Sequence, residues 1–149
     1  MYPGYEGYWT GIQNEPQKPA WITGAPPTQG EIEWARFAAQ IPHYVLSKTL
    51  TSAAWKRTTF LRGLDDVAGL KRQPGKDIYL IGGGRTTASL IEAGLVDELL
   101  LIVYPLIVGE GKALFATAER RRARELRRVQ RLPDGRVSLV YGIIDKRAG

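Results

Sequence analysis

The chain has 149 residues, 44% of them hydrophobic, a formal net charge of +6, no cysteine and one histidine. This length suits a single domain, residues 1–149, and the cysteine and histidine counts exclude disulfides, thiolate metal sites and histidine-rich metal centres. No apolar run approaches the ~20 residues that span a bilayer, and the first residues lack the pattern of a signal peptide, so we expect a cytoplasmic protein without a metal ion.

The N-terminal part of the chain divides into two predicted segments. Residues 1–30 are rich in glycine, proline and aromatic side chains, which favours an irregular segment over a strand or a long helix. Residues 31–40 place apolar side chains at helical spacing, so they predict a short amphipathic helix that Pro42 terminates.

A polar cluster follows the first predicted strand, 44–46. Ser47, Lys48 and Thr49 come directly after this strand. Ligands of open α/β sheets bind beyond the carboxyl ends of strands, and two hydroxyls beside an ammonium group suit a phosphate. An ordinary solvated turn is the alternative, because these residue types are also common in turns.

The middle of the chain predicts a strand at 58–61, a helix at 65–72 and a second strand at 78–81. The second of these strands is short, apolar and partly branched at the β-carbon. This composition is typical of a strand that is covered on both faces.

Three consecutive glycines, 82–84, follow this strand and lead into a predicted helix at 85–93. Thr86, Thr87 and Ser89 can cap the helix. A glycine turn at a helix N-terminus presents free backbone N–H groups and the positive end of the helix dipole, which suits a phosphate or pyrophosphate. The alternative is that the glycines only make a tight turn between a strand and a helix.

Two familiar phosphate-binding motifs fit this part of the chain poorly. A dinucleotide-binding fingerprint needs a third glycine where Thr87 stands. A P-loop needs serine or threonine after the pair 111–112, and Ala113 is there. The glycine segment therefore predicts an anion site without matching either motif.

The C-terminal part predicts a strand and a hairpin. Residues 99–108 are the most hydrophobic stretch, which favours a central strand buried on both faces, with an interruption at Pro105. Residues 126–144 predict an antiparallel hairpin around a turn at 132–136.

Arginine is concentrated in residues 120–131, which hold seven arginines and one acid, Glu125. The rest of the chain has 14 basic and 14 acidic residues, so a nucleic-acid or acidic-partner function would depend on this segment alone. Aromatic side chains are not interleaved with the arginines. A solvated face of a helix or strand is therefore favoured over a nucleic-acid site.

Four segments together resemble the dihydrofolate reductase-like superfamily, and more closely the C-terminal reductase domain of the bifunctional riboflavin-biosynthesis deaminase/reductase. They are Gly7-Tyr8-Trp9, residues 44–50, residues 77–84 and residues 94–115. The last is the most specific, because a glycine–leucine–valine–acid–acid opening, a proline within the strand and two spaced glycines before Leu114-Phe115 occur in that order in such proteins.

The resemblance implies a three-layer α/β fold, in which helices flank a mostly parallel central sheet and a C-terminal antiparallel hairpin closes it. It also implies an oxidoreductase that uses NADPH to deliver hydride to a pterin- or aminopyrimidine-like heterocycle. Family members commonly have a cis peptide between the two glycines of the pyrophosphate cradle, here Gly83 and Gly84. The implied cofactor contacts are Ser47, Lys48, Thr49, Gly82, Gly83, Gly84, Arg85, Thr86 and Thr87.

Within this set, Ser47 and Lys48 are similar to the serine–arginine pair that holds the 2′-phosphate of NADPH. Lysine keeps the positive charge of arginine but loses its bidentate fork, which would weaken a preference for NADPH over NADH. Residues 83–86 are similar to the pyrophosphate cradle.

The sequence departs from the family at its start. Family members normally have a central strand and a helix before the Gly-Tyr-Trp segment, and this chain begins about where that segment begins. The absent part supplies the catalytic carboxylate of dihydrofolate reductases, so the catalytic residue is unknown here. We expect a homodimer or completion by a partner, because an apolar sheet edge would otherwise be exposed. A catalytically inactive remnant of the reductase fold is the alternative function.

Overall fold

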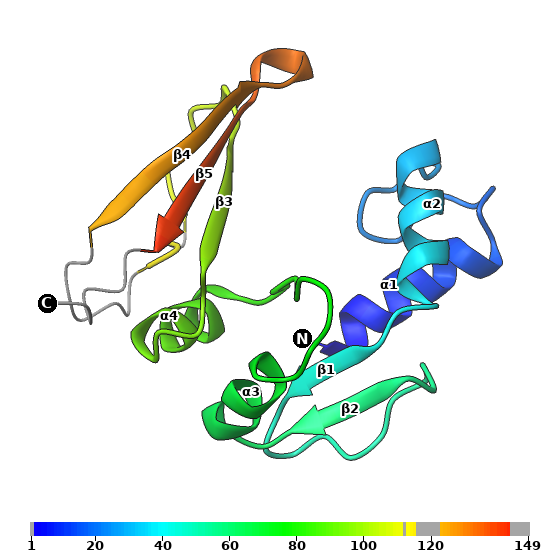
Figure 1. Cartoon of the computed structure of the whole chain (residues 1–149). Coiled ribbons are helices and arrows are strands. Elements are labelled where there is room, and N and C mark those ends of the chain that lie inside the picture. The colour runs from blue at the N-terminus through cyan, green and yellow to red at the C-terminus, as the bar shows by residue number, and fades with distance from the viewer. Residues whose placement is uncertain (1, 112, 116–122, 144–149) are drawn as a thin grey trace, which may run out of the picture. The chain divides into compact units, whose positions relative to one another are not determined.

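The computed structural model describes residues 2–111, 113–115 and 123–143 (Figure 1). The chain divides into two compact units, Met1–Asp66 and Val67–Gly149. The elements in chain order are α1 (Tyr2–Asn14), α2 (Gln29–Ala38), β1 (His43–Leu46), β2 (Thr58–Leu61), α3 (Leu64–Lys71), α4 (Gly84–Glu92), β3 (Glu98–Val103), β4 (Arg124–Arg131), a short 3₁₀ turn (Pro133–Gly135) and β5 (Val137–Ile143).

The first unit begins with a helix, α1, where the composition predicted an irregular segment. That prediction is wrong for Tyr2–Asn14, for two physical reasons, and is confirmed for 15–28, where no helix or strand forms. Pro3 lies in the first turn, where its missing N–H leaves no hydrogen bond unmade. The buried side chains of Tyr8 and Ile12 are four residues apart, so they share one face of the helix, and this spacing outweighs the cost of the three glycines in α1.

Helices α1 and α2 pack around a small core of Tyr8, Ile12, Ala20 and Ala35. The predicted helix at 31–40 is confirmed as α2. Thr28 begins it with a reciprocal capping box, in which the Thr28 hydroxyl accepts from the N–H of Glu31 and the Glu31 carboxylate accepts from the N–H of Thr28 at 2.8 Å.

The predicted strands at 44–46 and 58–61 are confirmed as β1 and β2, which pair in parallel from His43↔Thr58 to Leu46↔Leu61. Their attachment to α1 is polar. The buried Glu6 carboxylate accepts hydrogen bonds from the backbone N–H groups of Ala54 (3.0 Å) and Trp55 (2.7 Å), just before β2. A carboxylate from α1 therefore fixes the segment that enters the second strand.

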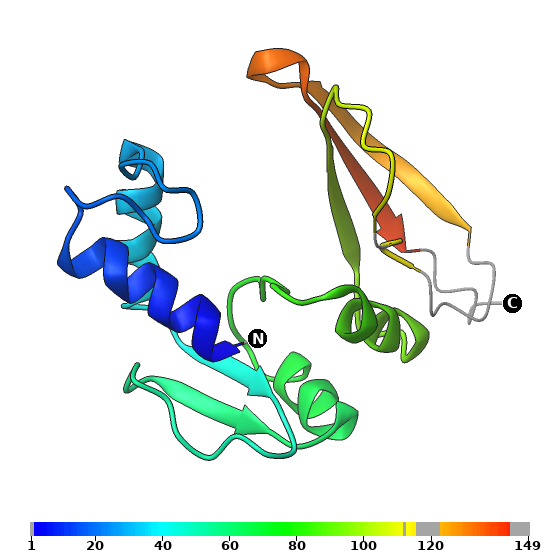
Figure 2. The same ribbon diagram turned by 180° about the vertical axis from the view of Figure 1, so that it is seen from behind.

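The second unit contains α4 and an antiparallel sheet with strand order β3-β5-β4 (Figure 2). The predicted hairpin is confirmed as β4 and β5, whose register runs from Arg124↔Ile143 to Arg131↔Val137. Asp134 and Gly135 turn the chain with φ values of 63° and 75°. Both residue types tolerate this left-handed backbone, which is why the turn was recognisable from the sequence.

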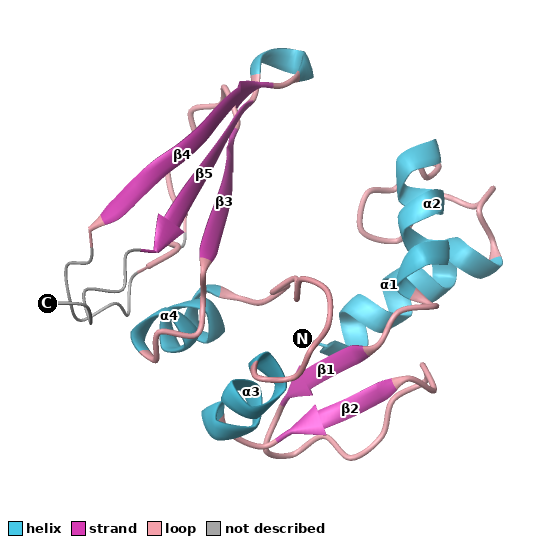
Figure 3. Cartoon of the chain, viewed as in Figure 1, coloured by secondary structure: helices cyan, strands magenta, loops and turns pink. Residues whose placement is uncertain are grey.

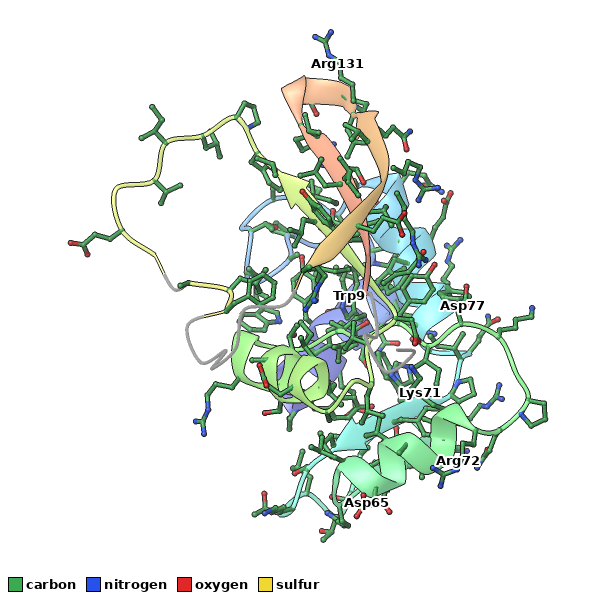
Figure 4. All side chains as sticks on the ribbon, turned by 60° about the vertical axis from the view of Figure 1, so that its left-hand side comes forward. Trp9, Asp65, Lys71, Arg72, Asp77 and Arg131 are labelled. Atoms are coloured by element: carbon green, nitrogen blue, oxygen red, sulfur yellow. The ribbon has the colours of Figure 1, made fainter. Side chains whose placement is uncertain are left out.

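The remaining predicted helices are also confirmed, at positions within one residue of those expected. Helix α3 corresponds to 65–72 and α4 to 85–93. The Lys71 ammonium at the end of α3, labelled in Figure 4, donates to the carbonyl of Leu95 at 3.0 Å and pairs with the carboxylate of Asp97. This contact ties α3 to the start of β3.

Two predictions about the sheet are wrong. Residues 78–81 form no strand; Figure 3 shows the segment between α3 and α4 as loop, and Tyr79 is 82% exposed. In the described ranges no strand lies alongside this apolar run to complete a ladder with it. The run 99–108 is not a central strand buried on both faces, because in the described sheet β3 lies at an edge and exposes Leu100 and Ile102. The predicted interruption at Pro105 is confirmed: β3 ends at Val103, since Pro105 has no N–H to donate and the chain leaves the sheet there.

The fold is therefore mixed α/β, with one parallel sheet of two strands and one antiparallel sheet of three. It differs in this from the single, mostly parallel central sheet that the resemblance implied. No helix in the described ranges has the length and apolar character that crossing a bilayer requires.

Candidate functional site

The start of α4 is the first part of the candidate site. Gly83 is the N-cap, with an extended backbone (φ −75°, ψ 165°), and no side chain of the described residues caps the helix. The N–H groups of Gly84, Arg85 and Thr86 therefore have no acceptor within the helix. Together with the helix dipole they form a local geometry that fits an anion.

The threonines and the serine do not cap α4, so the capping prediction is wrong. Thr87 is buried, and its N–H donates to the carbonyl of Gly83 at 3.1 Å. The Ser89 hydroxyl donates to the carbonyl of Arg85, one turn back along the helix. Of the predicted residues, Arg85 is exposed, Thr86 is half-buried and Thr87 is buried.

Gly84 has a packing role of its own. A β-carbon at this position would lie 2.8 Å from the backbone carbonyl oxygen of Leu114, which is closer than such atoms approach. A β-carbon at Gly82 would make ordinary contacts at 3.4 Å with the side chains of Leu80 and Thr86. All peptide bonds in the described ranges are trans, so the cis peptide that the resemblance implied between Gly83 and Gly84 is not present.

The second part of the candidate site is the turn after β1. The Ser47 hydroxyl accepts from the backbone N–H of Thr49 at 3.3 Å and of Leu50 at 3.1 Å, while Lys48 and Thr49 are exposed. The segment is therefore an ordered turn that the serine shapes. It also presents an ammonium group and a hydroxyl to solvent, as the predicted phosphate site requires.

No role was predicted for Arg62, which the structure brings to the same turn. Its Nη1 donates to the carbonyls of Ser47 (2.6 Å) and Leu50 (2.7 Å). A signal was present in the sequence, since Ser47 and Arg62 each follow a predicted strand. Two neighbouring parallel strands bring the residues that follow them together at one edge.

The two parts of the candidate site lie in different units. Ser47, Lys48 and Thr49 belong to Met1–Asp66, and residues 82–87 belong to Val67–Gly149. That the two parts form one cleft stays a prediction. The segment 120–131 lies partly outside the described residues; its described arginines are on β4, where Arg127 pairs with Glu98 on β3 at 3.1 Å.

The clearest electrostatic shifts fall on α1 and α2. Burial is the largest cause that raises the pKa of Tyr2, Tyr5 and Tyr8. The hydrogen bond from the Thr28 N–H, followed by that from the Thr28 hydroxyl, lowers the pKa of Glu31. Capping and core packing account for these shifts, so they do not identify a catalytic acid or base.

The model of the RibD C-terminal domain family matches residues 19–138. The chain belongs to the RibD C-terminal domain family. The resemblance drawn from the four sequence segments is therefore confirmed. The matched range contains the turn after β1, the glycine segment and the start of α4, so every predicted contact residue lies within the RibD C-terminal domain.

Two known proteins show how much of the chain is shared. The uncharacterized protein YyaP of Bacillus subtilis (strain 168) is 40% identical over 78 residues, which are 52% of this chain and 42% of YyaP. A crystal structure from Shewanella sp. PV-4, named as a candidate riboflavin biosynthesis protein, matches with a TM-score of 0.62 and 23% identity, over 71% of this chain and 62% of that one. This structural likeness shows the fold, and the chain spans less than two thirds of either relative.

Proposed function

We propose that this RibD C-terminal domain binds NADPH and acts as a reductase on a pterin- or aminopyrimidine-like heterocycle. The observation that carries the proposal is the uncapped start of α4, where three glycines lead into free backbone N–H groups. Membership of the RibD C-terminal domain family supports the cofactor and substrate classes. The bound cofactor would supply the hydride, and the proposal assigns no catalytic residue.

The chain's own residues would bind and orient the cofactor by charge and by backbone donors. The N–H groups of residues 84–86 would hold the pyrophosphate, with Gly82 and Gly83 bringing the backbone close. The Ser47 hydroxyl and the Lys48 ammonium would hold the 2′-phosphate, with Thr49 beside them. Thr87 would support the helix start from inside.

We also propose that the two units are parts of one domain and that the chain forms a homodimer. The family match runs across both units, which supports the first statement. The free edges of the antiparallel sheet support the second. The outer strand β4 carries four arginines, whose repulsion discourages pairing of two such edges, whereas β3 has one acid followed by five apolar residues.

The test of NADPH binding is a titration followed by tryptophan fluorescence. We expect saturable quenching, and the absence of binding at millimolar NADPH would reject the proposal. Oxidation of NADPH in the presence of dihydrofolate, a pterin or an aminouracil substrate tests the reductase step. Binding without hydride transfer to any of them would favour the alternative, a catalytically inactive remnant.

A pair of variants at Arg85 tests the role of the helix start. Arg85→Pro removes one N–H donor in the first turn, where proline is tolerated, and Arg85→Ala removes the side chain but keeps the donor. We expect the proline variant to bind NADPH about 10-fold more weakly than the alanine variant, as for a lost hydrogen bond to a charged group. Equal affinities would place the pyrophosphate elsewhere.

A further inference from the structure

The outer edge of β4 is a free strand edge with a high positive charge. Among the described residues β4 pairs with β5 alone, so the backbone N–H and C=O groups on its other side have no partner strand. The eight residues of β4 include four arginines and one acid. Any strand that pairs with this edge lies beside an excess of positive charge.

One of the four arginines is used within the sheet. Arg127 is the extra residue at a bulge, where the register with β5 shifts between Leu126 and Arg128. Its guanidinium lies against Gly142 of β5, where a β-carbon would overlap it, and Nη1 donates to the Glu98 carboxylate on β3 at 3.1 Å. The charge of Arg127 is therefore already paired with an acid of the same sheet.

The other three arginines have no such acid. Arg124, Arg128 and Arg131 make no ion pair with any residue that the structure describes. Arg128 and Arg131 are exposed, and the side chain of Arg131 points away from the sheet in Figure 4. Glu125, the acid of β4, likewise forms no ion pair within the described ranges. Three cations at this edge thus lack a counter-charge.

The register with β5 assigns the side chains of β4 to the two faces of the sheet, because side chains alternate along a strand and paired residues share a face. The residues of β4 on one face, each opposite every second residue of β5 from 137 to 143, are Arg124, Leu126, Val129 and Arg131. The side chains of Leu126 and Val129 are 50% and 57% exposed. This face of the edge therefore has a cation at each end and two apolar side chains between them.

We propose that the free edge of β4 binds an extended acidic segment of another protein, which adds to the sheet as a further strand. Backbone hydrogen bonds join the segment to the edge, and its side chains determine which sequences fit. Acids near its two ends lie beside Arg124 and Arg131, apolar side chains between them cover Leu126 and Val129, and an acid on the other face lies beside Arg128. This site is separate from the proposed nucleotide site and does not depend on it.

Charge complementarity decides which kind of strand occupies the edge. A second copy of β4 would bring two arginine-rich strands together, and the repulsion between them disfavours that pairing. An uncharged strand would leave three cations without a counter-charge beside it. An acidic strand is attracted by the same charges that keep copies of this chain apart.

A nucleic acid is the other polyanion that arginines bind. Two features of β4 favour a peptide over it. The free backbone donors and acceptors of the edge match another strand, and the exposed apolar pair, Leu126 and Val129, gains from contact with apolar side chains. Bases are held mainly by stacking on aromatic side chains, and β4 contains none.

The test is fluorescence anisotropy of a labelled, end-capped peptide, Asp-Thr-Val-Glu-Leu-Thr-Asp, titrated with the full chain. Its alternate residues have the order acid, apolar, apolar, acid, which complements the face described above. We expect saturable binding. The peptide Val-Thr-Asp-Glu-Asp-Thr-Leu has the same composition and charge in a different order, and it should bind about fivefold more weakly.

Backbone methylation tests whether the peptide binds as a strand. Alternate residues of a strand direct their N–H groups to opposite edges, so the N–H groups of one alternate set face β4 and those of the other set face solvent. N-methylation of the set that faces β4 should abolish binding, and N-methylation of the other set should change the Kd less than about twofold. Binding that survives methylation of either set overturns the addition of a strand.

Charge reversal locates the site. Arg131→Glu should weaken binding about fivefold, and Arg124→Glu combined with Arg131→Glu about 20-fold, because each attraction becomes a repulsion. The peptide Lys-Thr-Val-Glu-Leu-Thr-Lys should bind this double variant more tightly than it binds the wild type. Arg36→Glu is the matched control, since Arg36 is an exposed arginine of α2 in the first unit, and it should change the Kd less than about twofold.

Circular dichroism of each variant, together with an unchanged affinity of the double variant for NADPH, shows that a loss of peptide binding is local to β4. Absence of peptide binding at millimolar protein overturns the proposal, and the arginines then serve to keep strand edges of different copies apart. Equal affinity for the two peptide orders also overturns it. A single-stranded oligonucleotide that binds more tightly than the peptide, is released steeply by salt and is weakened by the same substitutions would assign the edge to nucleic acid instead.

Discussion

The two units of the chain differ in how many of their large hydrophobic side chains are exposed. Of the twenty large hydrophobic side chains that are exposed among the described residues, five lie in Met1–Asp66 and fifteen in Val67–Gly149. The first unit has a buried centre between α1 and α2. The second exposes most of 100–108, including Ile107, which is fully exposed.

This difference indicates that the first unit is stabilised by its own contacts, whereas the second depends on a further surface. Soluble monomers rarely expose contiguous apolar patches of large extent. The free edge of β3 and the unpaired segment 78–81 both belong to the second unit. A second copy of the chain would cover such a surface, as the homodimer proposal requires.

The largest expected difference in the free energy of unfolding is between the substitutions of two isoleucines, one in each unit. Ile12 is 3% exposed in the core of α1 and α2, so Ile12→Ala should lower the free energy of unfolding by ~3 kcal/mol through lost burial and a cavity. Ile107→Ala should change it by less than ~0.5 kcal/mol in a monomer. Urea unfolding followed by circular dichroism measures both changes.

Protein concentration makes this comparison a test of the dimer. Sedimentation of the wild type should show a dimer that dissociates on dilution, and stability should rise with concentration. A monomer at all accessible concentrations would contradict the homodimer. If Ile107→Ala lowers the free energy of unfolding as much as Ile12→Ala does, the exposed stretch is covered in solution, as a dimer would require.

The next effect concerns the polar contact that fixes the entry to β2. Glu6→Ala leaves the backbone N–H groups of Ala54 and Trp55 without their carboxylate acceptor, in a buried place. We expect a loss of ~2 kcal/mol in the free energy of unfolding. Glu33→Ala is the control, because Glu33 is exposed and accepts from the Gln29 side chain on the surface of α2.

Thermal unfolding of the two glutamate variants measures the difference. A drop for Glu6→Ala no larger than for Glu33→Ala would mean that water replaces the carboxylate, and that α1 is held to the strands by apolar packing alone.

The sequence predicted those elements whose signals are local. The apolar spacing of α2, the periodicity of α4 and the Asp134-Gly135 turn each specify a short piece of chain, and the structure contains all three. Helix α1 was not predicted, because its glycines and proline obscure the helical spacing of Tyr8 and Ile12. Local signals of this kind predict single helices and turns well.

Predictions that depended on neighbouring strands failed. An apolar run such as 78–81 becomes a strand only if another strand supplies hydrogen bonds, and nothing in the run itself reports whether one does. The same holds for β3, whose composition indicated burial on both faces. Arg62 was missed for this reason too, because its contact with Ser47 arises from strand pairing. The helix start after the glycine segment was predictable because its signals are local, and its role as an anion site stays a prediction.

The smallest expected effect concerns the helix starts of the two units, which differ in side-chain capping. Helix α2 has a side-chain cap from Thr28 and Glu31, and α4 has none. Because hydrogen bonds from Thr28 hold the pKa of Glu31 below its ordinary value of 4.5, the carboxylate stabilises the fold above that pH. This stabilisation is lost as the pH falls below 4.5 through the lowered pKa of the folded state. Glu31→Gln should therefore cost about 0.5 kcal/mol at pH 7 and progressively less in acid.

Urea unfolding at pH 7 and in acid, followed by tryptophan fluorescence, measures this difference in the first unit. Glu33→Gln removes a carboxylate from the same helix without a capping role, so its effect should be smaller at pH 7. A difference between wild type and Glu31→Gln that stays constant with pH would assign the stabilisation to the shape of the side chain. A difference that vanishes in acid would assign it to the charge of the carboxylate.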